Sequence, residues 1–192
     1  MNIKTTKLTM LALAMSFGCA TSAMALTSAE YKAQKTSIEA DYKVNRDKCG
    51  SLSANAKDIC VSEAKGTEKV AKAELEAQYK PGAKSDAKLR EAKADAAYDT
   101  AKEKCDDLAG NTKDVCVKDA KAAHTSALGS AKVSEANTKA SNDKTAKIAE
   151  ARQDATADTR KAEYAAAKER CDALAGNAKD SCVTDAKTKY GM

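Results

Sequence analysis

Large apolar side chains are scarce in this sequence. It contains no tryptophan and one phenylalanine. Leucine, isoleucine, valine and phenylalanine together make up only about a tenth of the residues after position 25, a share typical of chains with little core. A pocket for a small substrate needs more large apolar residues to line it. The composition therefore predicts a thin hydrophobic core and argues against an enclosed small-molecule site.

The residue sets of common active sites are also missing. The sequence shows no serine–histidine–acid set, no glycine-rich phosphate loop and no paired carboxylates suited to acid–base catalysis. His124, the single histidine, is most simply interpreted as a solvated helix residue. We therefore expect a protein that is not an enzyme and that binds no cofactor or metal.

The one long apolar run lies at the N-terminus. Lys4 and Lys7 precede an apolar stretch of about ten residues, and Ala23-Met24-Ala25 follows it, which is the pattern of a secretory signal peptide over residues 1–25. The stretch is shorter than the roughly 20 residues of a spanning helix. We expect cleavage after Ala25, a periplasmic location and a soluble mature chain without a transmembrane segment.

Cys19 offers an alternative, because a lipidated cysteine also follows a small residue such as Gly18. Ser16 and Phe17, however, stand where a lipidation motif usually has a leucine and a small residue. Signal-peptide cleavage is the preferred interpretation, and lipid anchoring at Cys19 is the second.

Removing residues 1–25 lowers the formal charge from +5 to +3, because Lys4 and Lys7 are lost. A charge so near balance favours neither nucleic-acid binding nor strong binding to an anionic membrane.

Three segments of the remaining chain align without gaps, over residues 40–65, 96–121 and 162–187. Each has a tyrosine seven residues before its first cysteine, a leucine three residues after it, and a second cysteine eleven residues after the first. The tyrosines are Tyr42, Tyr98 and Tyr164, and the leucines are Leu52, Leu108 and Leu174. The chain is therefore an imperfect tandem repeat of one unit.

Each repeat reads as two helices with a turn midway between its cysteines. Alanine, lysine and glutamate favour helix, and Tyr98, Ala101, Cys105 and Leu108 form a coiled-coil-like seam. Gly110 suits the left-handed position that ends a helix. Asn111 then suits an N-cap, with Asp114 as its acidic capping-box partner, and Gly176, Asn177 and Asp180 repeat this pattern. The first copy has Ala54 in place of the glycine, so we expect Asn55 to take the left-handed conformation there.

Six cysteines in an exported chain indicate a disulfide framework. Because the two cysteines of a repeat are equally far from its turn, an antiparallel hairpin brings them to the same height. The predicted pairs are Cys49–Cys60, Cys105–Cys116 and Cys171–Cys182. Zinc sites and catalytic redox pairs use closer cysteine spacings, so metal binding and redox sensing are the weaker alternatives.

The predicted fold is all-α: three tandem antiparallel αα-hairpins, each closed by one disulfide, with an elongated arrangement favoured and one compact bundle as the alternative. The hairpins span 26–80, 81–128 and 146–192. Pro81-Gly82 marks the first boundary, and a Ser- and Thr-rich linker over 129–145 marks the second. Tyr42, Tyr98 and Tyr164 are expected to pack against the partner helix, with an interaction stripe for another protein as the alternative. A Lys-Asp pair before each second cysteine is read as capping and surface charge (Lys57-Asp58, Lys113-Asp114, Lys179-Asp180).

The thrice-repeated pattern around Cys105-Asp-Asp-Leu-Ala-Gly-Asn-Thr-Lys-Asp-Val-Cys116 resembles exported Ala/Lys-rich helical proteins of Gram-negative bacteria that are often labelled TolA-like or cell-envelope-biogenesis proteins. The resemblance implies a periplasmic location and helical character, and we carry over no role in the Tol system. Our leading hypothesis is a non-enzymatic structural or interaction protein of the cell envelope with a protein partner. A stress-protectant or holdase-type chaperone, and a redox or metal sensor, are the alternatives.

Overall fold

The computed structural model describes residues 26–138 and 144–192. Within these ranges the chain is helical and contains no strand. The helices are α1 (Ser28–Lys48), α2 (Ala54–Tyr79), α3 (Ala83–Cys105), α4 (Gly110–Thr138), α5 (Lys144–Cys171) and α6 (Gly176–Tyr190), with one 3-10 helix, η1 (Cys49–Ser51), after α1. The all-α prediction is confirmed. The predicted signal peptide, with Cys19, lies outside the described residues.

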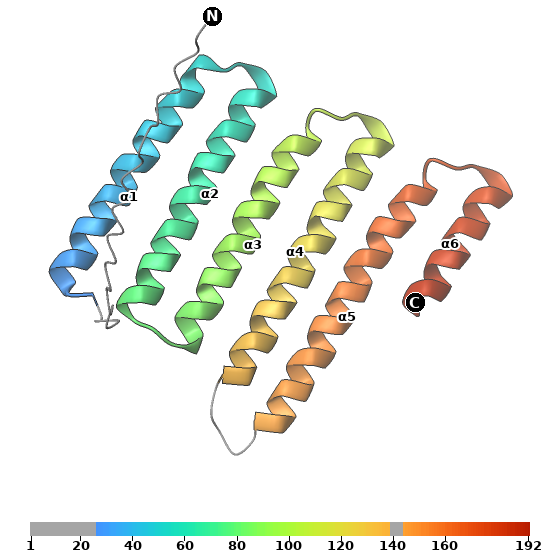
Figure 1. The fold of residues 1–192 in the computed structure, drawn as a ribbon. Coiled ribbons are helices and arrows are strands. Elements are labelled where there is room, and N and C mark those ends of the chain that lie inside the picture. Colours follow the sequence, from blue (N-terminus) through green and yellow to red (C-terminus); the bar gives the residue numbers. More distant parts are fainter. Residues whose placement is uncertain (1–25, 139–143) are drawn as a thin grey trace, which may run out of the picture.

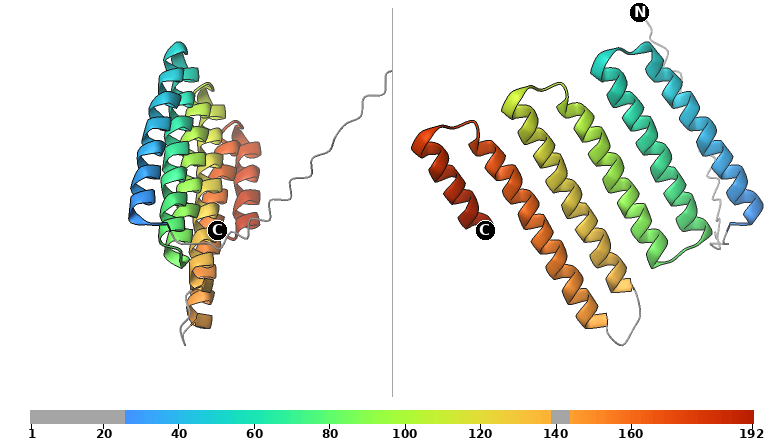
Figure 2. Two further views of the ribbon diagram at one scale, coloured as in Figure 1. Left: turned by 60° about the vertical axis from the view of Figure 1, so that its left-hand side comes forward. Right: turned by 180° about the vertical axis from the view of Figure 1, so that it is seen from behind.

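Consecutive helices run antiparallel and form three hairpins, α1–α2, α3–α4 and α5–α6 (Figure 1). Among the described residues, each helix packs only against its neighbours in the sequence. The helices therefore lie side by side in one layer, which is narrow when seen edge-on (Figure 2). All three hairpin turns lie at the same edge of this layer, and α1 and α6 lie at its opposite ends (Figure 1). The elongated arrangement is observed rather than a compact bundle.

Helix ends follow from local chemistry. At the start of α1, Thr27 and Glu30 form a capping box: the Thr27 hydroxyl accepts from the Glu30 backbone N–H at 3.2 Å, and the Glu30 carboxylate accepts from the Thr27 N–H at 2.8 Å. Pro81 and Gly82 lie between α2 and α3, as predicted for the first hairpin boundary. Gly191, at a φ of 65°, ends α6 in the left-handed conformation.

Small residues let neighbouring helices approach closely. A Cβ placed on Gly66 of α2 would lie 2.9 Å from the Cβ of Ala96 on α3, and one on Gly129 of α4 would lie 2.9 Å from the Cβ of Ala155 on α5. The buried apolar residues of the described chain are mostly alanines and cysteines, and Leu75 is the one large aliphatic side chain among them. The thin core predicted from composition is therefore present, and close backbone approach replaces large side chains.

The predicted linker over 129–145 needs correction. Helix α4 continues to Thr138, and α5 begins at Lys144, while residues 139–143 lie outside the described residues. Gly129 and Ala131 are buried within α4. Residues 129–138 are helical, and Gly129 fits closely against Ala155 of α5, so a composition typical of a linker here serves helix packing.

Candidate functional surfaces

Each hairpin turn is closed by the disulfide that the repeat predicts: Cys49–Cys60, Cys105–Cys116 and Cys171–Cys182. The Cα atoms of the pairs lie 5.6, 5.7 and 5.7 Å apart, as disulfide geometry requires. The first cysteine of every pair is fully buried, whereas the second is half-buried. Reactive cysteines are usually accessible, so this burial favours a structural role over a redox-sensing one. The three disulfides indicate an oxidising compartment.

The turns share one left-handed residue directly after the N-cap of the second helix. Gly110 and Gly176 adopt φ values of 55° and 54°, as predicted. In the first copy Ala54 itself takes this conformation, with a φ of 49°. The prediction that Asn55 would do so is wrong. The first turn has the same left-handed position as the other two, and Ala54 occupies it. The left-handed region costs an L-residue about 1–2 kcal/mol.

The asparagine after this residue is not an N-cap. The side-chain amide of Asn55 donates to the Glu103 carbonyl oxygen of α3 at 2.7 Å, and that of Asn111 donates to the Glu169 carbonyl oxygen of α5 at 2.8 Å. Each acceptor lies in the last turn of its helix, where its carbonyl also accepts the backbone N–H of the residue three positions later, Asp106 or Asp172, at 3.1 Å. These asparagines therefore connect one hairpin to the next. Sequence reasoning missed this role, although the recurrence of the asparagine in every copy was a signal.

In the second and third copies, the lysine three residues before the second cysteine forms an ion pair within its own turn. Lys113 Nζ lies 2.8 Å from Asp106, and Lys179 Nζ lies 2.8 Å from Asp172. The ion pair with Lys179 lowers the pKa of Asp172. The first copy has Gly50 at the acidic position, so Lys57 has no such partner there.

The three repeat leucines lie outside the predicted seam. Leu52, Leu108 and Leu174 follow the last residue of the first helix and are 42%, 38% and 43% exposed. The helix ends before the leucine because the chain turns directly after the cysteine. The three disulfide-closed turns lie at one edge of the layer (Figure 1), and this edge therefore exposes three leucines to solvent. We call it the leucine edge.

His124 is not the solvated residue that the sequence suggested. Its ring stacks on Tyr98, with centroids 4.7 Å apart, and its Nε2 lies 2.7 Å from Asp95. Asp95 also forms an ion pair with Lys69 at 2.6 Å. The pKa of Asp95 is lowered, chiefly by Lys69 and further by His124. The cluster joins α2, α3 and α4, and its long-range contacts explain why a solitary histidine could not be placed from sequence.

The tyrosines of the suggested interaction stripe are half-buried. Tyr98 packs across its hairpin against His124, as the packing interpretation expects. Tyr42 lies in a groove between α1 and α2 beside Ala64 and Glu68, and Tyr164 is half-buried on α5. A role for these tyrosines in binding another protein stays a prediction.

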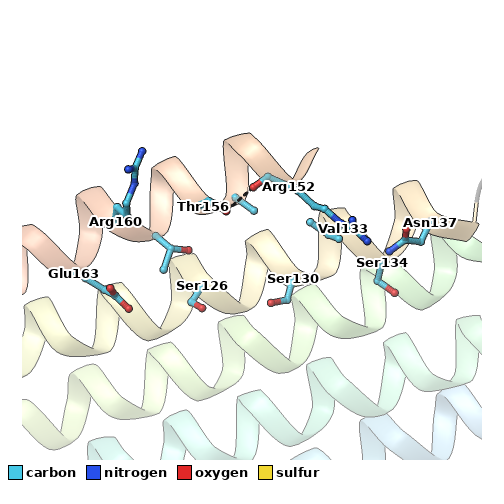
Figure 3. Close-up of a pocket in the computed structure, with 11 residues that line it drawn as sticks. Ser126, Ser130, Val133, Ser134, Asn137, Arg152, Thr156, Arg160 and Glu163 are labelled. Atoms are coloured by element: carbon cyan, nitrogen blue, oxygen red, sulfur yellow. Dashed lines mark hydrogen bonds between the residues drawn. The ribbon is translucent and has the colours of Figure 1, made fainter. Parts of the chain in front are cut away.

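A polar groove runs between α4 and α5, with a volume of about 720 Å³. Ser126, Ser130 and Ser134 line it from α4 at intervals of one helical turn. From α5, the Arg152 side chain extends along the groove towards Asn137, whereas that of Arg160 points away from α4 (Figure 3). Hydroxyl and guanidinium groups can bind polar or anionic groups. The charged side chains that line this groove, Arg152, Arg160 and Glu163, are however exposed to solvent.

The described residues contain no group of three or more histidine, cysteine or acidic side chains placed to hold a metal ion. Among the helices of the same residues, none combines the length and the hydrophobicity needed to cross a membrane.

Comparison with known proteins found no matching family model, no similar curated protein and no similar solved structure.

Proposed function

We propose that this chain is a non-enzymatic structural or interaction protein of the cell envelope, exported to the periplasm with cleavage after Ala25. The single-layer arrangement carries this proposal. Within residues 26–138 and 144–192, each helix is covered only by its sequence neighbours, so this part of the chain leaves both broad faces and the leucine edge to a protein partner. The signal-peptide pattern and the three disulfides support export to an oxidising compartment.

The leucine edge carries three of the exposed large apolar side chains of the described residues. Leu52, Leu108 and Leu174 occupy equivalent positions on rigid turns, so their relative placement is fixed by the disulfides and by the packing between hairpins. Exposed apolar side chains held in fixed positions are typical of protein interaction sites. We propose that the partner contacts this edge.

Capture from periplasm tests the proposal. The wild-type protein and a variant with Leu52→Ser, Leu108→Ser and Leu174→Ser are exported as baits, cross-linked in the cell and purified. A matched control carries serine at three exposed lysines, Lys32, Lys88 and Lys147, away from the turns. We expect one protein to be enriched by the wild type and by the control, and lost with the leucine variant. Capture of no specific protein by the wild type would contradict the proposal.

The leucine edge also supports a second candidate, a holdase-type chaperone. Exposed leucines on a highly charged helical array are suited to bind unfolded chains without specificity. This candidate predicts that the wild-type protein suppresses aggregation of an unrelated unfolding client at equimolar ratio, and that the leucine variant does not. Equal aggregation with and without the wild-type protein would exclude it.

A further inference from the structure

The two junctions between hairpins use the same contacts at equivalent positions. In the first junction, Asn55 donates to the Glu103 carbonyl, and in the second Asn111 donates to the Glu169 carbonyl. Each asparagine lies five residues before the second cysteine of its copy, and each acceptor lies two residues before the first cysteine of the next copy. The junction is therefore a repeated docking geometry.

An ion pair recurs beside this hydrogen bond. Glu63 on α2 pairs with Lys104 on α3 at 3.3 Å, and Asp119 on α4 pairs with Arg170 on α5. The acid lies three residues after the second cysteine, and the base lies directly before the first cysteine of the next copy. Both junctions thus place an acid on the outgoing hairpin and a base on the incoming one.

The two ends of the layer carry the residues equivalent to this junction, and there Lys48 Nζ donates within its own helix, to the Asn45 side-chain oxygen at 3.2 Å. The third copy has Asn177 and Asp185 on α6 at the outgoing positions, and the first copy has Asp47 and Lys48 on α1 at the incoming positions. All four residues are exposed. Neither Asn177 nor Asp185 makes a side-chain hydrogen bond or an ion pair within the described residues, whereas Asn55 and Asn111 are half-buried in their junctions.

An exposed apolar side chain of α1 lies at the groove between α1 and α2, which Lys48 also lines. Val44 lies five residues before Cys49 and is 55% exposed, the most of any large apolar residue described. The equivalent residue of the third copy, Ala166, is 2% exposed on α5. The equivalent residue of the second copy, Thr100, is half-buried and lies 3.4 Å from Ser62 of α2. The repeat position of Val44 is therefore covered in α3 and α5 and exposed in α1.

We propose that α6 of one molecule docks on α1 of a second copy, with the geometry of the internal junctions. Asn177 then donates to the Asp47 carbonyl, Asp185 pairs with Lys48, and the docked α6 covers Val44. The contact is heterologous, so successive copies extend the layer head to tail. This inference goes beyond the proposed function, because it concerns self-association and needs no envelope partner.

The new junction is shorter than the internal ones. Helix α6 has 15 residues, whereas α2 and α4, which form the internal junctions, have 26 and 29. No disulfide links two copies in this arrangement. The assembly is therefore expected to be reversible and to grow with protein concentration.

Zero-length cross-linking of the purified protein tests this directly. Equal amounts of ¹⁴N- and ¹⁵N-labelled protein are mixed and treated with a carbodiimide, which joins an amine to a carboxylate in contact. We expect a Lys48–Asp185 link with mixed labels, because α1 and α6 lie at opposite ends of one molecule (Figure 1). A link of Lys48 with a single label only would show that a segment of the same chain covers α1, and would overturn the proposal. No mixed link to Lys48 at high concentration would also overturn it.

A charge swap distinguishes this docking from non-specific association. Asp185→Lys and Lys48→Glu each place like charges in the junction, so each variant alone should lose about tenfold or more of its association in sedimentation velocity. In an equimolar mixture, every junction between the two different variants has an opposite-charge pair, so alternating copies should associate again. Glu150→Lys, which reverses an exposed charge of α5 away from the ends, should have no effect. Circular dichroism checks that every variant is folded, and failure of the mixture to recover would contradict the proposal.

Discussion

Contacts within a hairpin and contacts between hairpins are stabilised in different ways. Within a hairpin a disulfide closes the turn, and in two copies a lysine–aspartate pair braces it. Between hairpins an asparagine, an ion pair and small residues hold the helices together. The covalent closure makes each turn independent of core size, whereas the junctions depend on close fit. A chain with so few large apolar residues needs both.

Removing one disulfide should have the largest effect on this comparison. The double change Cys105→Ser and Cys116→Ser should destabilise the middle hairpin by about 3 kcal/mol, because the chain-entropy model assigns this to a closed loop of roughly a dozen residues. Hydrogen exchange of α3 and α4, compared with α1 and α2, measures the local effect. Equal exchange in variant and wild type would mean that packing alone fixes the hairpin.

Overfilling a junction should come next. Gly66→Leu forces side-chain atoms into Ala96, whose Cβ would lie 2.9 Å from the new Cβ, and should destabilise by about 1–3 kcal/mol. Gly50→Leu is the matched control, because nothing lies within 4 Å of its added Cβ. Urea unfolding of the two variants should differ. Equal stability would show that α2 and α3 are not in close contact.

The first turn should gain stability from Ala54→Gly. Because Ala54 adopts a φ of 49°, glycine relieves its backbone strain and should stabilise the hairpin by about 1 kcal/mol. The reverse change, Gly110→Ala in the second copy, should cost a similar amount. Thermal unfolding of both variants measures the effect, and a loss of stability in Ala54→Gly would contradict the assigned turn.

Loss of one junction hydrogen bond should have a similar or smaller effect. Asn111→Ala should destabilise the contact between α4 and α5 by about 1 kcal/mol. Asn177→Ala removes the same residue where the described chain offers it no partner, and should leave the stability of dilute monomer unchanged. Denaturant unfolding at low concentration compares them, and equal losses would mean that the asparagine acts within its own turn.

The smallest expected effect is a dependence on acid. Because the pKa of Asp95 is lowered from its ordinary value of 3.8, its contribution is complete above that value and is lost as the pH falls through the lower pKa of the folded state. The contact between the first two hairpins should therefore weaken only below about pH 4. Comparing Asp95→Asn with the wild type from pH 7 to pH 3 isolates this carboxylate. An Asp95→Asn variant as stable as the wild type at pH 7 would show that the cluster adds nothing.

Sequence reasoning predicted what is local to one repeat. The helices, the turn at Gly110 and the pairing of Cys105 with Cys116 follow from residue types and spacing within about a dozen positions. Their causes lie in nearby residues, so one sequence is sufficient to find them.

What the sequence did not predict depends on the neighbouring hairpin. Asn111 and His124 find partners on other helices, and Gly129 is helical because it fits against Ala155. Leu108 was misplaced for a different reason, because the seam was extended past the true helix end. Both kinds of error concern where helices meet or stop, which periodicity alone does not fix.

The disulfide-closed hairpin turns also determine how this molecule responds to mechanical force. If it is pulled between its two ends, helices that contact only their neighbours can separate one after another, and each disulfide then keeps the residues between its cysteines out of the extended chain. Every hairpin therefore retains a short closed loop that tension cannot straighten without reduction. Under load the molecule would in this way yield stepwise and keep intact the turns from which it can refold.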